Sequence, residues 1–157
     1  MKKIGVMCLL VMIFLSGCSN NSVTSIITNG EVNFSIAHPK NWTYTEDKND
    51  SHSDTENPNY DTMVTFILED TEETFFIGGF VTPFYPNQNA TKRSLTTKDK
   101  VQISVYEKVG EEVISVYYSY NTETKIKYYA GLIMSNESYK KNKKTIESIV
   151  KSFKLIS

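Results

Sequence analysis

The sequence predicts an α+β fold in which an antiparallel β-sheet packs against an amphipathic helix at the C-terminus. Between residues 26 and 134, short runs rich in Val, Ile, Tyr and Phe alternate with turn residues, which is typical of half-buried strands. The period changes after Asn136, where apolar residues recur at helical spacing on one face: Ile146, Ile149, Val150 and Phe153. The length of 157 residues fits one domain.

The first eighteen residues resemble the signal of a bacterial lipoprotein. Two positive residues, Lys2 and Lys3, precede an apolar run over residues 4–14, which is too short to span a membrane. The run ends in Leu15-Ser16-Gly17-Cys18, the aliphatic, small, small, cysteine order of a lipobox. We therefore expect cleavage before Cys18 and a diacylglyceryl group on its thiol, which would hold the mature chain on the outer face of the cell membrane.

This expectation divides the chain into three parts. Residues 1–17 form a cleaved signal peptide, residues 18–30 a lipidated tether with the first strand of a hairpin, and residues 31–157 the folded domain. The segment from Ser19 to Ser25 is small and polar, which favours a flexible tether. Richness in Asn, Lys, Ile and Ser indicates an AT-rich genome and favours a Gram-positive host.

The composition of the mature chain excludes several classes of function. Loss of Lys2 and Lys3 changes the formal net charge from −1 to about −3, and no concentrated basic face indicates a nucleic-acid partner. Cys18 is then the only cysteine left, and lipid occupies its thiol, so disulfides, thiol catalysis and zinc–thiolate sites are excluded. We expect no catalytic residues, no cofactor and no bound metal.

A hairpin, five strands and two loops are predicted before the helix. The hairpin joins residues 26–28 to residues 31–37 through Asn29-Gly30, the dipeptide best suited to a tight primed turn. Residues 46–59 contain no hydrophobic side chain, so we expect a mobile surface loop there. A second loop is expected at 83–100, and the strands are predicted at 62–68, 74–81, 101–108, 111–120 and 125–134. Asn136 is the expected N-cap of the helix, with Tyr139 on its apolar face.

Two motifs resemble the ends of PsbP-like domains. The segment from Phe34 to Trp42, FSIAHPKNW, is similar to their aromatic-x-Ile-x-x-Pro-x-x-Trp opening. The helix from Tyr139 to Lys154 is similar to their terminal helix with its Ser-Phe ending, and together the motifs span most of residues 31–154. The resemblance implies an antiparallel β-sheet sandwiched by helices. The motifs bring no catalytic residues with them. The family includes photosynthetic subunits and many bacterial lipoproteins of unknown role, so the resemblance implies a fold and not an activity.

Acidic residues and histidines are the first candidates for a site. The first loop carries ligands that could hold Ca²⁺, Mn²⁺ or a transition metal: Asp47, Asp50, His52, Asp54 and Glu56. Because EF-hand spacing is absent, we expect a solvated loop instead. His38 could belong to a catalytic triad, but no Gly-x-Ser-x-Gly motif accompanies it, and we expect a structural role.

Three tyrosines and a glycine pair are the next candidates. Tyr106, Tyr117 and Tyr129 fall on the less hydrophobic sides of three successive strands, where they could stack on glycans, dock a partner, or pack beneath helices. We expect the packed arrangement. Gly78-Gly79 is not followed by Gly-Lys-Ser/Thr, so we expect a bulge or tight packing under a helix there and not a phosphate loop.

Lysines line the polar side of the last helix at Lys140, Lys144 and Lys151. They could touch anionic lipid or a wall polymer. Glu147 interrupts the row, so we expect an ordinary solvated helix face.

These observations favour a non-enzymatic module of the cell envelope that binds or scaffolds another surface component. Its expected partners are the membrane, through the lipid on Cys18, and an envelope protein or wall polymer. The alternative is a lipoprotein that binds a small ligand or metal and delivers it to a membrane partner. An enzyme would have to rely on scattered carboxylates or His38.

Overall fold

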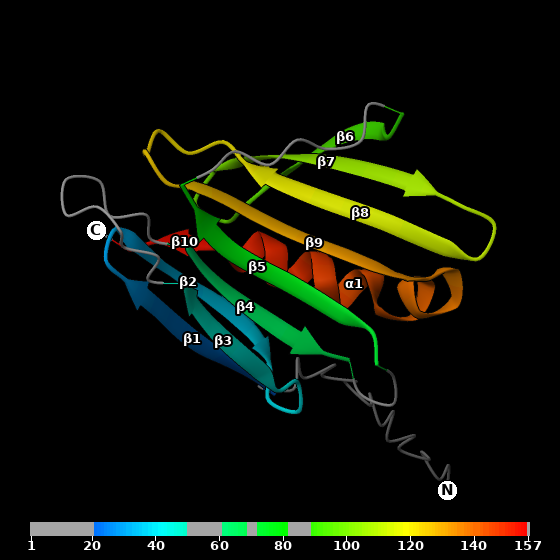
Figure 1. The fold of residues 1–157 in the computed structure, drawn as a ribbon, viewed down its shortest axis with the longest axis horizontal. Helices are drawn as coiled ribbons and strands as arrows, with labels where there is room; N and C mark the ends of the chain where they lie inside the picture. Colours follow the sequence, from blue (N-terminus) through cyan, green and yellow to red (C-terminus); the bar gives the residue numbers. More distant parts are fainter. Residues whose placement is uncertain (1–20, 50–60, 69–71, 82–88, 157) are drawn as a thin grey trace, which may run out of the picture.

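The computed structural model describes residues 21–49, 61–68, 72–81 and 89–156, which form two antiparallel β-sheets and one α-helix (Figure 1). The large sheet has seven strands in the order β3 (Tyr44–Asn49), β4 (Asp61–Ile67), β5 (Thr74–Phe80), β9 (Lys127–Ser135), β8 (Val113–Tyr120), β7 (Gln102–Val109) and β6 (Thr91–Thr96). The small sheet has the order β1 (Ser22–Asn29), β2 (Val32–Pro39) and β10 (Lys154–Leu155). The helix α1 (Asn136–Ser152) connects β9 to β10.

The helix and the small sheet lie side by side on one face of the large sheet (Figure 1). Seven strands at a spacing of about 4.8 Å make a sheet roughly 29 Å wide, whereas a helix with its side chains is about 10 Å across. One helix therefore covers only part of the apolar face, and β2 covers more of it with Val32, Phe34 and Ile36. The expected sandwich between helices is wrong for the described residues, because α1 is their only helix and the small sheet completes its layer.

The core between these layers is centred on aromatic rings. Phe153 is 1% exposed, and its ring centroid lies 5.6 Å from that of Phe34, 4.2 Å from that of Tyr120 and 5.2 Å from that of Tyr128. The Tyr120 hydroxyl donates a hydrogen bond to the carbonyl of Val150 in the last turn of α1, at 3.1 Å. These contacts join both sheets to the end of the helix and confirm the predicted burial of Phe153.

The predicted hairpin is confirmed, with its turn shifted by one residue. Asn29 pairs with Val32, so the two central residues of the turn are Gly30 and Glu31. Gly30 has a φ of 56°, whereas Glu31 keeps an ordinary negative φ. This is the pattern of a type II′ turn, in which glycine occupies the first central position. The five later strands of the prediction correspond to β4, β5, β7, β8 and β9.

Three strands appear where the sequence predicted loops or a tether. Residues 46–49 belong to β3, residues 91–96 form β6, and Ser22 to Ser25 belong to β1. Each of these strands lies at the edge of its sheet. An edge strand is held mainly by its backbone hydrogen bonds, so its side chains can be polar. A prediction based on the pattern of buried side chains then does not detect it. Residues 50–59 and 83–88 of the two predicted loops lie outside the described residues.

The helix α1 begins one residue earlier than predicted. Ser135 is the N-cap, and its hydroxyl accepts a hydrogen bond from the backbone N–H of Ser138 at 3.2 Å. Asn136, the expected cap, instead donates from its side chain to the carbonyls of Gly110 and Glu111. The predicted apolar face is buried as expected. No helix among the described residues combines the length and the apolar character needed to cross a bilayer.

The glycine pair in β5 lets other parts of the chain pack closely. A Cβ on Gly78 would overlap the carbonyl oxygen of Thr62, and a Cβ on Gly79 would lie 2.8 Å from Cγ1 of Val32 and 2.9 Å from Cε1 of Tyr128. Pairing with β4 and β9 runs through both glycines without a bulge. Tight packing is therefore confirmed, but not under a helix: Gly79 packs under the small sheet, and Gly78 packs against the backbone of β4.

Candidate functional site

A polar cluster joins α1 to β6 and β7. Arg93 on β6 places its Nη2 2.6 Å from Oε1 of Glu147 on the helix, and its Nε 3.7 Å from Oε2 of Glu107 on β7. Burial alone would lower the pKa of the Arg93 guanidinium. The nearby Glu147 carboxylate acts in the opposite direction, and the pKa of Arg93 lies above its ordinary value. The hydroxyl of Tyr139 donates to the same oxygen of Glu107 at 3.4 Å. Arg93 therefore interacts with both carboxylates, and its closer partner is Glu147.

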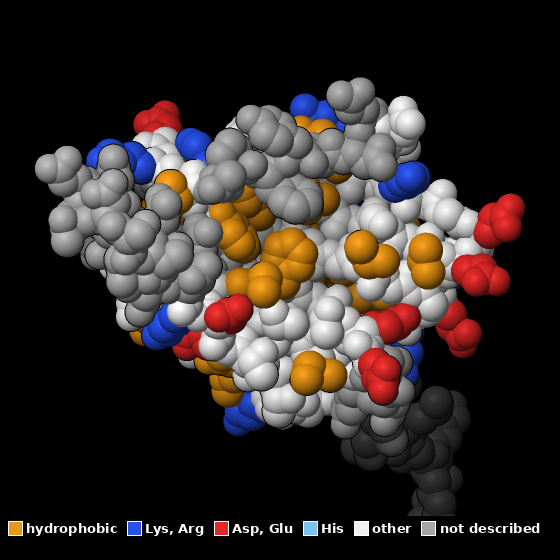
Figure 2. Space-filling model, viewed as in Figure 1, with side chains coloured by type: hydrophobic (Ala, Val, Ile, Leu, Met, Phe, Trp, Pro, Cys, Tyr) orange, Lys and Arg blue, Asp and Glu red, His pale blue; other side chains and the backbone are white. Residues whose placement is uncertain are grey.

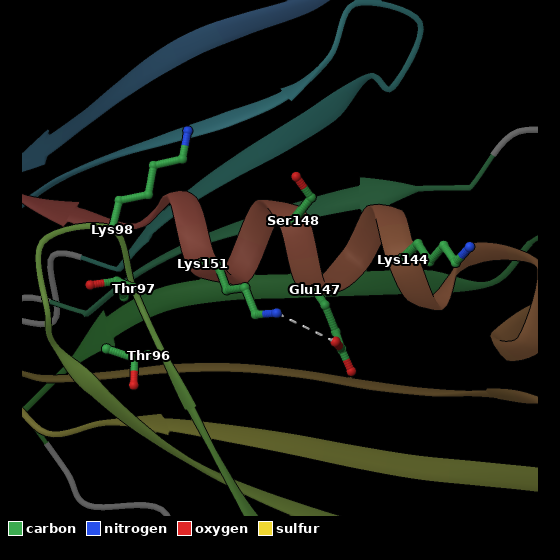
Figure 3. Close-up of a pocket in the computed structure, with 7 residues that line it drawn as sticks. All are labelled: Thr96, Thr97, Lys98, Lys144, Glu147, Ser148 and Lys151. Atoms are coloured by element: carbon green, nitrogen blue, oxygen red, sulfur yellow. Dashed lines mark ion pairs between the residues drawn. The ribbon is translucent and has the colours of Figure 1, made fainter. Parts of the chain in front are cut away.

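A groove of about 550 Å³ opens beside this cluster (Figure 3). The helix contributes one wall, and the end of β6 with the turn that follows contributes the other. The lining residues are Thr96, Thr97, Lys98, Lys144, Glu147, Ser148 and Lys151. Glu147 and Lys151 project from the same side of the helix, and Lys144 lies one turn closer to its N-terminus (Figure 3).

Hydrogen bonds fix the turn that forms the second wall. The backbone N–H of Thr97 donates to the carbonyl of Val101 at 2.9 Å, and the Thr97 hydroxyl accepts from the N–H of Val101 at 3.0 Å. The N–H of Lys98 donates to the carbonyl of Lys151 at 3.3 Å, which ties the turn to the end of α1. The two walls are therefore held in a defined relation to each other.

The groove carries an excess of positive charge. Its single carboxylate, Glu147, already binds Arg93 and lies 3.9 Å from Nζ of Lys151. Asp99, next to Lys98 in the turn, is 3.7 Å from Nζ of Lys154. Within the described part of the chain, Lys98 and Lys144 have no carboxylate within ion-pair distance, and both are exposed. A groove with two uncompensated lysines and several hydroxyl groups can bind an anion.

Only the helical wall of this groove involves residues that were predicted from the sequence to lie together. Lys144 and Lys151 were expected on a solvated helix face, and the structure places both of them in the groove, whereas Lys140 is not among its lining residues. Lys98 and Arg93 fall in a segment that the sequence predicted as a loop. Their polar surroundings gave no periodic signal, so only the pairing of β6 with β7 brings them to the helix.

The three tyrosines lie on the outer face of the large sheet, which is the face away from α1 and the small sheet. Tyr117 pairs with Tyr106 and Gly131, and its ring centroid is 5.5 Å from that of Tyr129. Figure 2 shows hydrophobic side chains gathered over the middle of this face. Tyr117 and Tyr129 are 9% and 6% exposed, and Tyr106 is half-buried. The predicted burial is confirmed for two of the three rings, but the expected position beneath a helix is wrong.

His38 occupies a structural position. It is 4% exposed, its Nε2 lies 2.9 Å from the hydroxyl oxygen of Ser25, and its Nδ1 lies 2.9 Å from the carbonyl oxygen of Pro39. Its ring packs against Tyr44 and Phe66 at centroid distances of 5.5 and 5.1 Å. These contacts link β1, β2, β3 and β4.

Most of the candidate metal ligands of the first predicted loop lie outside the described residues. These are Asp50, His52, Asp54 and Glu56. Asp47 is described, and it is an exposed residue of β3. Among the described residues, no three His, Cys, Asp or Glu side chains are grouped so that they could hold a metal ion.

A carboxylate outside the groove stabilises the start of α1. The backbone N–H of Ser135 donates to Oε1 of Glu73 at 2.7 Å. Burial opposes ionisation of this carboxyl, but hydrogen bonds from Ser138 and Ser135 outweigh it and hold the pKa of Glu73 below its ordinary value. An ionised Glu73 also interacts favourably with the positive end of the helix dipole.

The depressed pKa of Glu73 predicts a pH dependence of stability. A carboxyl whose pKa is lower in the folded state stabilises that state above its unfolded pKa of about 4.5, and this contribution is lost as pH falls through the folded pKa. Chemical denaturation should therefore show wild type more stable than Glu73→Gln at neutral pH, with the difference shrinking below about pH 4.5. The exposed neighbour supplies a control variant, Glu72→Gln. A difference that stays constant from neutral to acidic pH would contradict this role of Glu73.

Comparison with known proteins identifies the fold class. The chain is similar in structure to cyanobacterial PsbP (CyanoP) from Synechocystis sp. PCC 6803, with a TM-score of 0.52 over 89% of this chain and 96% of that chain. The two sequences are 10% identical, so the likeness concerns the fold alone. The chain therefore has a PsbP-like fold, as its two end motifs predicted. No protein-family model and no curated protein matches its sequence.

Proposed function

We propose that this chain is a lipid-anchored protein of the bacterial cell envelope that binds an anionic ligand in the groove beside α1. The anchor is the lipid on Cys18, expected from the lipobox. The observation that carries the binding role is the positive excess of the groove: its carboxylate is already paired with Arg93, while Lys98 and Lys144 remain uncompensated within the described residues. The role is non-enzymatic, that of a binding or scaffolding module.

Charge distribution supports an anionic ligand. The whole chain has a formal net charge of −1, so a positive groove is a local feature and not a reflection of the total charge. Thr96 and Ser148 add exposed hydroxyl groups to the lining, and these can donate hydrogen bonds to phosphate or carboxylate oxygens. Phosphate-bearing components of the envelope, including wall polymers, have this chemistry.

The anchor is tested by labelling cells with palmitate. Wild type should take up label and fractionate with membranes, because two acyl chains hold a protein on a bilayer stably. The variant Cys18→Ala should remain an unlabelled precursor. A mature cellular protein that retains the intact sequence from Met1 to Cys18 by mass spectrometry would overturn the anchor.

The groove is tested by binding to phosphocellulose, a polymer that carries phosphate groups. The variant Lys98→Glu/Lys144→Glu should bind roughly tenfold more weakly than wild type, since each reversed charge removes an exposed ion pair worth about 0.5–1 kcal/mol. The control Lys108→Glu/Lys125→Glu changes the net charge equally at two exposed lysines outside the groove. Equal losses in the two variants would show that net charge, and not the groove, determines binding.

A further inference from the structure

We infer that the groove binds anionic phospholipid headgroups of the membrane that carries the anchor, an inference that rests on the proposed lipidation of Cys18. The groove would then form a second contact with the bilayer, beside the lipid itself. This second contact would fix the orientation of the domain, which a lipid on a short tether leaves free.

A continuous series of contacts connects the start of the domain to the groove. Thr24 of β1 pairs with Ala37 of β2. The backbone N–H of Ala37 donates to the hydroxyl of Ser152 at 2.8 Å, and that hydroxyl lies 3.2 Å from the carbonyl oxygen of Ala37. Ser152 follows Lys151, whose carbonyl accepts from the N–H of Lys98. The end of α1 that carries the groove is therefore the end that lies closest to where the described chain begins.

The tether is too short to hold the domain far from the bilayer. Cys18 precedes Ser22 by four residues, so even a fully extended chain spans about 14 Å between them. The tether therefore limits how far the start of β1, and the end of α1 connected to it, can lie from the membrane surface. The side chain of Lys98 extends toward the side of the helix on which β1 and β2 lie (Figure 3).

Charge near the anchor favours the membrane as the source of the anion. The exposed Lys40 lies at the same end of the domain, because its backbone N–H donates to the carbonyl of Asn21 at 2.8 Å. Basic residues next to a membrane anchor are attracted to anionic lipids, and one lipid anchor combined with a basic patch is a common way to secure a peripheral protein. The volume of about 550 Å³ lies within the usual range for a small-molecule site, which suits a headgroup.

The test uses the mature lipidated protein, purified from cells and reconstituted into vesicles. One set of vesicles contains phosphatidylcholine alone, and a second set contains phosphatidylcholine mixed with phosphatidylglycerol. Lysine acetylation is followed by mass spectrometry at each position. We expect Lys98, Lys144 and Lys151 to react severalfold more slowly in the anionic vesicles, whereas Lys108 and Lys125 react at the same rate in both. In the variant Lys98→Glu/Lys144→Glu, Lys151 should lose its protection.

A third arm adds inorganic phosphate to the neutral vesicles at constant ionic strength. Protection of the groove lysines by phosphate there, without protection by phosphatidylglycerol, would overturn the headgroup inference and indicate a site for a free anion. Equal slowing at Lys108 and Lys125, or no slowing at all, would also overturn it. The mass of the same protein reports the lipid on Cys18 separately. Absence of that lipid would refute the anchor and, with it, the placement of the groove at the membrane.

Discussion

Replacement of Phe153 by alanine is expected to lower the free energy of unfolding by about 3–5 kcal/mol. Phe153 is 1% exposed and lies between the end of α1 and the start of β10. Its ring contacts those of Phe34, Tyr120 and Tyr128. Removal of the ring leaves a cavity between the two layers that neighbouring aromatic side chains cannot fill without leaving their own positions. Denaturant titration of wild type and Phe153→Ala measures the loss.

Phe80→Ala is a matched control for this experiment. It removes the same side chain from the outer face of the large sheet, where Phe80 is only half-buried. The cost there should be clearly smaller, because less apolar surface returns to water. A loss below about 1 kcal/mol for Phe153→Ala would show that the end of the helix does not pack as described.

A single methyl group at Gly78 should be almost as damaging. The Cβ of Gly78→Ala would overlap the carbonyl oxygen of Thr62, which belongs to the backbone of the neighbouring strand β4. That atom can move only if the pairing of β4 with β5 is distorted, so we expect a loss of about 3 kcal/mol, at the upper end of overpacking effects. Thermal and denaturant unfolding of the variant measure this loss.

Gly131→Ala provides the comparison within the same sheet. Its Cβ would lie 2.8 Å from Cε1 and Cζ of Phe76, at the far end of a half-buried side chain that can turn away. The cost at Gly131 should therefore be smaller than the cost at Gly78. The opposite order would show that the backbone of β4 yields more easily than the ring of Phe76.

The parts of the fold that could be predicted from sequence are those in which burial imposes a pattern. Val32, Phe34 and Ile36 alternate with polar residues because one face of β2 is buried, and the helical spacing of Ile146, Ile149 and Val150 reflects one buried face of α1. β3 and β6 carry no such pattern, because an edge strand needs little buried surface. The small sheet was missed as a layer, since the pairing of β2 with β10 joins distant segments that share no local signal.

The candidate site also has a part that could be predicted from the sequence and a part that could not. Helical spacing places Lys144 and Lys151 on one side of α1, so half of the groove could be predicted from sequence alone. Lys98 reaches the groove only through the turn after β6, and Arg93 offsets Glu147 only because β6 pairs with β7. The lipid on Cys18 depends on a short local motif, and it stays a prediction.

The position of β2 between β1 and β10 has a consequence for the order of folding. The N–H of Ala37 reaches its partner on Ser152 across 115 residues of chain, and β10 follows every other described strand in the sequence. Contacts between such distant segments form slowly, because the entropy of closing a long loop is lost before the contacts contribute favourable free energy. The small sheet is therefore completed only when β10 is available. In the exported protein proposed above, β10 would cross the membrane after every other described strand, so the small sheet would be completed late in secretion and would not obstruct it.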